Sequence, residues 1–143
     1  IRLLGSRPVE VYAEIGRLFH GGMEAEDACM VHMTFACGAT AVLDSSWPRT
    51  SSYPDDVTLE IVGTKGLIHV DGFAQKNELI VGEAGTTRWS YWGDPAIGLM
   101  IRDFVRAVRE GETAHAAEEE IALPLAFALA ARESAKTGLS VAV

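Results

Sequence analysis

Short apolar runs separated by glycine-containing turns fill the first two thirds of the sequence, and this spacing limits the possible folds. Connections this short are typical of hairpins and cannot carry a parallel crossover. The pattern therefore predicts about seven strands, mostly antiparallel. The runs are residues 9–15, 28–35, 39–47, 57–62, 67–70, 78–81 and 86–92.

The run 28–35 presents two different faces. Cys29, Val31, Met33 and Phe35 share the apolar one. Met30, His32 and Thr34 lie on the other, which is mixed in character. A mixed face suits neither a dry core nor open water, so we expect it to contact another protein, in a homodimer or a larger homo-oligomer.

The last third of the chain changes to a helical period. Asp94 is suited to cap a helix that has Pro95 at its first position and ends at Gly111. The apolar stripe of this helix is Ile97, Met100, Ile101, Phe104, Val105 and Val108.

A second helix is expected from near Glu119 to Thr137, or from a later start because of Pro124, with Gly138 beyond its end. Its narrow face of mostly small residues predicts close packing on the sheet: Leu123, Phe127, Ala130 and Ser134. A short strand is expected within 139–143. The predicted fold class is α+β: one domain over residues 1–143, with a mostly antiparallel open β-sheet, helices packed on one face, and the other face available for oligomerisation.

Composition excludes several functions. A net charge of −8 argues against a nucleic-acid surface. No apolar run is long enough to span a membrane, and we expect a cytoplasmic protein. Cys29 and Cys37 are too few for a disulfide framework and match no zinc spacing, so no metal site is expected.

Three stretches, in order, carry a family resemblance: residues 39–47, ending Asp44-Ser45-Ser46-Trp47; residues 59–71, around Gly63-Thr64-Lys65-Gly66; and the helix ending Ser134-Ala135-Lys136-Thr137-Gly138. This order resembles the C-terminal domain of the Gfo/Idh/MocA family of NAD(P)-dependent oxidoreductases. The motifs themselves are turns and a helix end, and 63–66 is too short for a phosphate-binding P-loop.

The resemblance implies a parent enzyme in which this chain is the substrate-binding and dimerisation half. In the family, a Rossmann domain holds NAD or NADP and the catalytic lysine, and the catalytic histidine lies upstream of the first strand matched here. That domain is absent from this chain. No catalytic or cofactor-binding residue is therefore assigned, and the chain is expected to be inactive alone. The implied substrate is a sugar, a polyol or a related hydroxyl compound.

Trp47, Arg49 and Tyr53 are the candidate substrate contacts. Aromatic rings stack on sugars and hydroxyls need directional partners, and the family's loop after this strand approaches the substrate cleft. The alternative is a surface loop in which Trp47 covers the core edge. His20, in a glycine-rich loop, is expected to be solvated. Whether the chain is an enzyme is left open; the other reading is a non-catalytic self-association or partner-binding module.

Overall fold

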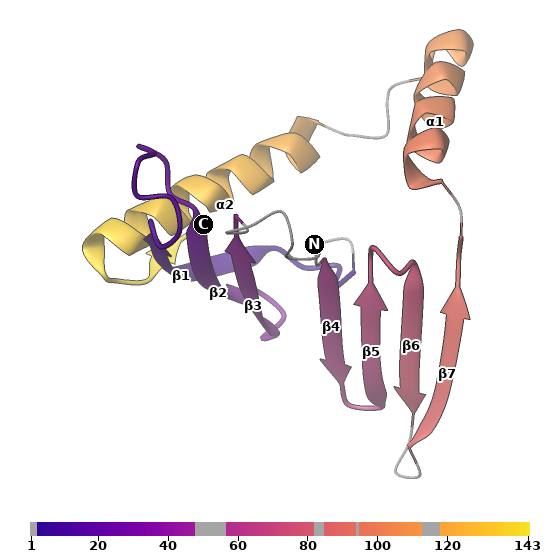
Figure 1. Cartoon of the computed structure of the whole chain (residues 1–143), viewed down its shortest axis with the longest axis horizontal. Coiled ribbons are helices and arrows are strands. Elements are labelled where there is room, and N and C mark those ends of the chain that lie inside the picture. Colours follow the sequence, from indigo (N-terminus) through magenta and orange to yellow (C-terminus); the bar gives the residue numbers. More distant parts are fainter. Residues whose placement is uncertain (1–2, 48–56, 82–84, 94, 113–117) are drawn as a thin grey trace. The chain divides into compact units, whose positions relative to one another are not determined.

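The computed structural model describes residues 3–47, 57–81, 85–93, 95–112 and 118–143, with the side chains of the last segment described from Ala122 onward. Eight strands and two helices are formed by the described residues (Figure 1). They group into two compact units, Ile1–Thr50 with Ala114–Val143 and Ser51–Thr113. We call these the first and second units.

The first unit contains a four-stranded antiparallel sheet in the order β3-β2-β1-β8. Its strands are β1 (Pro8–Gly16), β2 (Ala28–Phe35), β3 (Thr40–Ser46) and β8 (Val141–Ala142). The β2–β3 turn contains Gly38 at a φ of 84°, a left-handed conformation that glycine adopts without strain. The expected hairpin is therefore confirmed.

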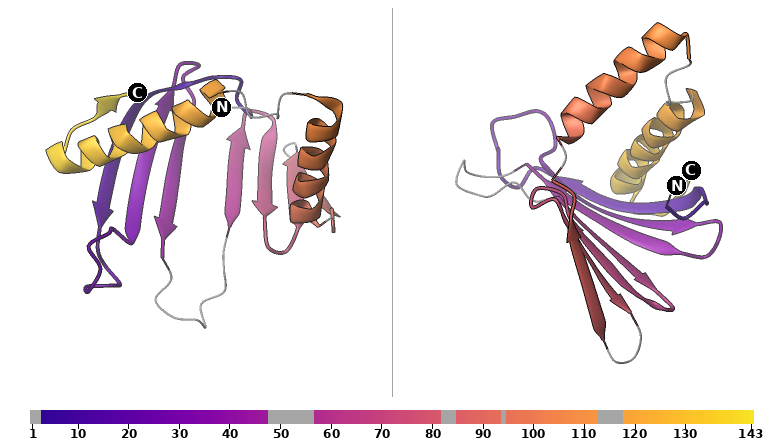
Figure 2. Two further views of the ribbon diagram at one scale, coloured as in Figure 1. Left: turned by 90° about the horizontal axis from the view of Figure 1, so that it is seen from above. Right: turned by 90° about the vertical axis from the view of Figure 1, so that its right-hand side faces the viewer.

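Helix α2 (Glu118–Thr137) covers one face of this sheet (Figure 2). The core beneath it consists of Val11, Ala13 and Val31 from the strands and Ala131 from the helix. Small side chains at the contact allow the helix backbone to approach the strands closely. Pro124 lies inside the helix, which begins at Glu118, so the later start is not seen.

The second unit contains another four-stranded antiparallel sheet, in the order β4-β5-β6-β7. Its strands are β4 (Thr58–Gly63), β5 (Gly66–Asp71), β6 (Lys76–Val81) and β7 (Thr86–Tyr91). Gly66 lies so close to the next strand that an added Cβ would overlap the carbonyl oxygen of Ile80. Close backbone approach, rather than a positive φ, therefore requires glycine at this position.

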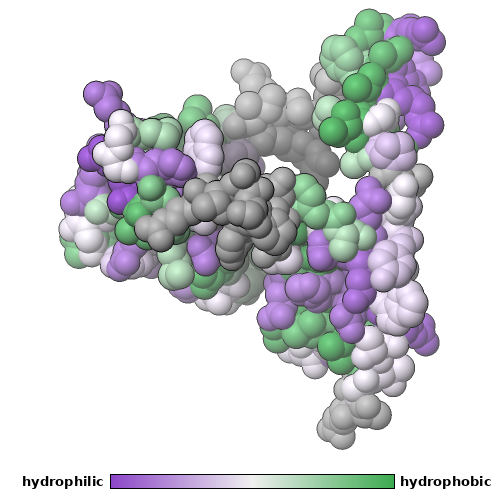
Figure 3. All heavy atoms as spheres, in the orientation of Figure 1, coloured by the Kyte–Doolittle hydropathy of each residue, from purple (hydrophilic) through white to green (hydrophobic). Residues whose placement is uncertain are grey.

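Helix α1 (Ala96–Glu110) ends at Gly111, whose φ is 66°. Pro95 occupies the N-cap position, and the expected cap Asp94 lies outside the described residues. Figure 3 shows apolar and hydrophilic side chains on opposite sides of this helix. The six residues of its apolar stripe are all exposed: Ile97, Met100, Ile101, Phe104, Val105 and Val108.

The structure thus has the predicted α+β class with antiparallel open sheets, although the strands form two sheets instead of one. Packing of a helix on one face is seen for α2, whereas α1 keeps its stripe exposed. The face of the first sheet opposite α2 carries Met30, which is 56% exposed, with exposed His32 and partly exposed Thr34. This face is exposed, as predicted. Its use in oligomerisation stays a prediction.

Candidate functional site

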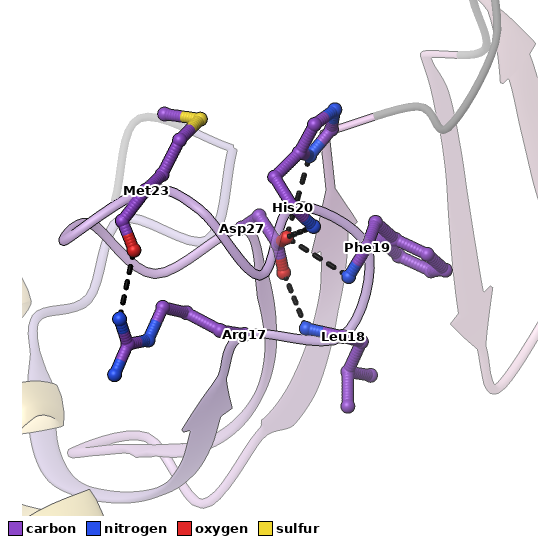
Figure 4. Close-up of polar contacts among 6 residues, drawn as sticks. All are labelled: Arg17, Leu18, Phe19, His20, Met23 and Asp27. Carbon is purple, nitrogen blue, oxygen red and sulfur yellow. Dashed lines mark hydrogen bonds and ion pairs between the residues drawn. The ribbon is translucent and has the colours of Figure 1, made fainter.

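A buried carboxylate organises the loop that joins β1 to β2. Asp27 precedes β2, and its side chain is fully covered. Its Oδ1 accepts the backbone N–H of Leu18 at 2.7 Å (Figure 4). Its Oδ2 accepts the N–H groups of Phe19 at 2.9 Å and His20 at 2.5 Å. Three consecutive backbone donors are thereby satisfied by one side chain, which fixes this turn of the loop.

The backbone of Asp27 ties the same loop to the end of β3. Its N–H donates to the carbonyl of Gly16 at 3.0 Å, and its carbonyl accepts the N–H of Trp47 at 2.7 Å. Burial raises the pKa of the Asp27 carboxyl, but the backbone donors and the His20 side chain outweigh burial and hold the pKa below its usual value. Asp27 is therefore a carboxylate at neutral pH.

His20 lies between Asp27 and Trp47. Its Nδ1 is 3.3 Å from Oδ2 of Asp27, within ion-pair distance if the ring is protonated. Its ring centroid is 6.1 Å from that of Trp47, and the two planes meet edge-on at 63°. The His20 side chain is only 32% exposed, so the expectation of a solvated histidine is corrected. The cause is Asp27, whose carboxylate binds the backbone N–H of His20 and lies beside its ring.

The backbone N–H of Trp47 is held by the carbonyl of Asp27, whereas its ring is exposed. The residue is 60% exposed. The other two predicted substrate contacts, Arg49 and Tyr53, lie outside the described residues. The structure therefore brings Trp47 together with His20, which sequence reasoning had not placed at a site.

Two further contacts hold the loop. Arg17 Nη1 donates to the carbonyl of Met23 at 2.7 Å (Figure 4). Glu26 pairs with Arg132 of α2 at 3.0 Å. A backbone hydrogen bond at Glu26 and the charge of Arg132 lower the pKa of the Glu26 carboxyl. Both partners are substantially exposed, so the ion pair orients the loop more than it stabilises the fold.

Other aromatic and polar candidates lie apart from this loop in the sequence. Trp89 and Tyr91 pack edge-on in the second unit, with centroids 5.6 Å apart, and both are exposed. In the part of the chain that the structure describes, no three His, Cys, Asp or Glu side chains gather as metal ligands. Nor is any described helix long and apolar enough to cross a membrane.

A Rossmann-type dinucleotide site is the cofactor site that the family resemblance implies. The sequence contains no Gly-x-Gly-x-x-Gly, and every described strand pair is antiparallel. The Rossmann type of site needs that fingerprint at a parallel β-α-β turn. The residues of this chain therefore do not fit a nicotinamide dinucleotide of that binding mode.

The comparisons with known proteins agree on one family. The profile of the GFO/IDH/MocA C-terminal domain matches residues 1–69. A scyllo-inositol 2-dehydrogenase (NAD(+)) from Bacillus subtilis (strain 168) is 26% identical over 124 residues, covering 80% of this chain and 34% of that protein.

Solved structures extend the agreement to the fold. A Thermotoga maritima protein assigned as an oxidoreductase matches with a TM-score of 0.80 and 30% identity, over 97% of this chain and 42% of that one. An aldose-aldose oxidoreductase from Caulobacter crescentus matches with a TM-score of 0.77 and 19% identity, over 99% of this chain and 43% of that one.

The chain is similar to the C-terminal domain of the Gfo/Idh/MocA family, by the family profile over residues 1–69 and by fold over nearly its whole length. It spans about a third of the curated relative and about two fifths of the solved chains.

Proposed function

We propose that this chain is the substrate-binding and self-association half of an NAD(P)-dependent oxidoreductase acting on a sugar, a polyol or a related hydroxyl compound. The observation that carries the proposal is the exposed ring of Trp47, anchored by Asp27 in a domain similar to that of this family. An anchored aromatic face is a suitable platform for the C–H face of a ring-shaped polyol.

The substrate class is supported by the curated relative, whose name specifies scyllo-inositol and NAD(+). In the full-length protein, a bound nicotinamide would supply the hydride acceptor or donor. The residues described here bind and orient a substrate, and they carry no proton-transfer step of their own. We also expect the protein to work in the cytoplasm, a reducing compartment that suits the free thiols of Cys29 and Cys37.

Self-association is supported by the open face of the first sheet. Met30 and Val42 are 56% and 65% exposed there, and Tyr12 and His32 lie beside them in the register. An exposed mixed face of this kind also favours the second candidate, a module that only self-associates. The two candidates differ in whether Trp47 contributes to the binding of a polyol.

The test uses the full-length protein and scyllo-inositol, with reduced nicotinamide as the readout. We expect turnover with NAD⁺ or NADP⁺, and no turnover by the 143-residue chain alone. Trp47→Ala should raise KM about tenfold with a smaller effect on kcat, because a stacking surface is lost. Trp89→Ala, an exposed aromatic of the second unit, is the matched control. Absence of turnover by the full-length protein would favour the non-catalytic module, whereas equal KM values for wild type and Trp47→Ala would remove Trp47 from the substrate site.

A further inference from the structure

We propose that His20 is a second ligand contact beside Trp47, oriented by Asp27 so that Nε2 receives a hydroxyl group of a sugar or polyol. The inference rests on the proposed function and deepens it. It assigns a specificity-determining residue to a loop for which the sequence suggested no role.

The orientation of the ring follows from the carboxylate. Nδ1 is buried 3.3 Å from Oδ2 of Asp27, within ion-pair distance but without hydrogen-bond geometry, and the other ring nitrogen points away from that carboxylate (Figure 4). In a neutral imidazole, an Nδ1–H directed at a carboxylate leaves Nε2 as an acceptor. A hydroxyl is a donor that matches this acceptor, and 32% of the side chain is exposed.

The side chain of His20 is not needed to hold the loop. The bond that fixes the loop at this position comes from the backbone N–H of His20, which any residue except proline would supply. The neighbouring N–H groups of Leu18 and Phe19 bind the same carboxylate. The imidazole adds only a weak contact to Asp27, so its main role in this loop is assigned to the ligand.

The geometry of the two rings suits a polyol. Because His20 meets Trp47 edge-on at 63° and 6.1 Å, the rings are not stacked face to face. The 60% exposure of Trp47 leaves an apolar surface next to a polar ring edge. Ring-shaped polyols present the same two features, an apolar C–H face and a rim of hydroxyls.

The experiment compares two amides in the full-length protein. Asparagine reaches about as far as Nδ1 and can still bond Asp27, whereas glutamine reaches about as far as Nε2. Binding of scyllo-inositol, myo-inositol, D-glucose and D-xylose is measured by calorimetric titration, and KM and kcat are measured for any substrate. His69→Gln, a partly buried histidine of the second unit, is the matched control.

We expect His20→Asn to weaken binding and raise KM about three- to tenfold, the effect of one lost hydrogen bond. kcat should stay within about twofold, because the interaction is made equally before and during reaction. His20→Gln should recover part of the affinity, and His69→Gln should match wild type. Thermal midpoints of both His20 variants should stay within about 2 °C of wild type.

Each of the other outcomes would refute a specific part of the proposal. Unchanged binding by His20→Asn, with weakened binding by Trp47→Ala, would remove His20 and leave the Trp47 surface standing. A lowered thermal midpoint with no recovery by His20→Gln would make His20 a structural anchor and refute the contact. If both Trp47→Ala and His20→Asn bind like wild type, or if wild type binds none of the four compounds, the proposed function fails together with this inference.

Discussion

Ser134 of α2 completes the hydrogen bonding of Ala13 in β1: its Oγ accepts the Ala13 N–H at 3.0 Å. The same Oγ donates to the carbonyl of Leu139 at 2.7 Å. Strand β8 pairs only with Glu10 and Val11, so this N–H lies beyond the end of β8. A fully buried hydroxyl therefore continues the ladder where the strand stops and ties helix to sheet.

Ser134→Ala should lower the free energy of unfolding by about 1–3 kcal/mol, because it leaves the buried N–H of Ala13 without a partner. Urea unfolding measures the loss, and faster amide exchange of Ala13 gives the local readout. Ser140→Ala, at an exposed position just past the helix, is the control and should be near neutral. Equal losses for the two variants would contradict this role for Ser134.

Gly66→Ala should destabilise the second unit by about 2 kcal/mol or more, because its Cβ would meet backbone atoms of Ile80 and Val81 that cannot move aside independently. Gly63→Ala, in the same turn, would place its Cβ in ordinary contact at 3.6 Å and should be tolerated. In a Trp47→Phe background, the fluorescence of Trp89 and Trp92 reports on this unit alone. Similar urea midpoints for both alanine variants would count against the close approach.

The sequence predicted the strands well because their periodicity is local. Residues 28–35 form β2 with the expected bounds, and the expected alternation places Val11 and Ala13 in the core. Val9 departs from that alternation and is 43% exposed, because the register shifts between Pro8 and Glu10. A single irregularity of this kind leaves no signal in an apolar pattern.

The candidate site was less predictable, because it depends on contacts between segments distant in sequence. Trp47 was identified from its residue type and its place after a strand. Asp27 and His20 were not, since only the folded loop brings His20 to Trp47. The available signal was an acidic residue directly before β2 and after a glycine-rich loop, a position from which a carboxylate can satisfy turn N–H groups.

Asp27→Asn should weaken the first unit at neutral pH and flatten its acid sensitivity. The pKa of Asp27 is lowered in the folded state, so its carboxylate contributes stability above the ordinary unfolded value of about 3.9. That contribution is lost as the pH falls through the lower folded pKa. The gap in urea midpoint between wild type and Asp27→Asn should therefore be full at pH values well above about 4 and close below it.

The control for Asp27 is Glu24→Gln, an exposed carboxyl in the same loop, which should leave the acid profile close to wild type. A gap between wild type and Asp27→Asn that stays constant down to strongly acidic pH would show that the carboxylate's charge is not what holds the loop.

Met30→Glu combined with His32→Glu should dissociate the full-length protein if the open face of the first sheet is its self-association surface. Both side chains lie on that face, and the new carboxylates would stand among Glu14, Asp44 and Tyr12 across the register. In an isologous dimer, both copies would bring the new charges into the interface, so every unfavourable contact would occur twice. Sedimentation velocity should show a shift to monomer, with far-UV circular dichroism unchanged.

Lys65→Glu, in the turn between β4 and β5, is the control and should sediment like wild type. A double variant that keeps the wild-type sedimentation coefficient would place the contact on another surface.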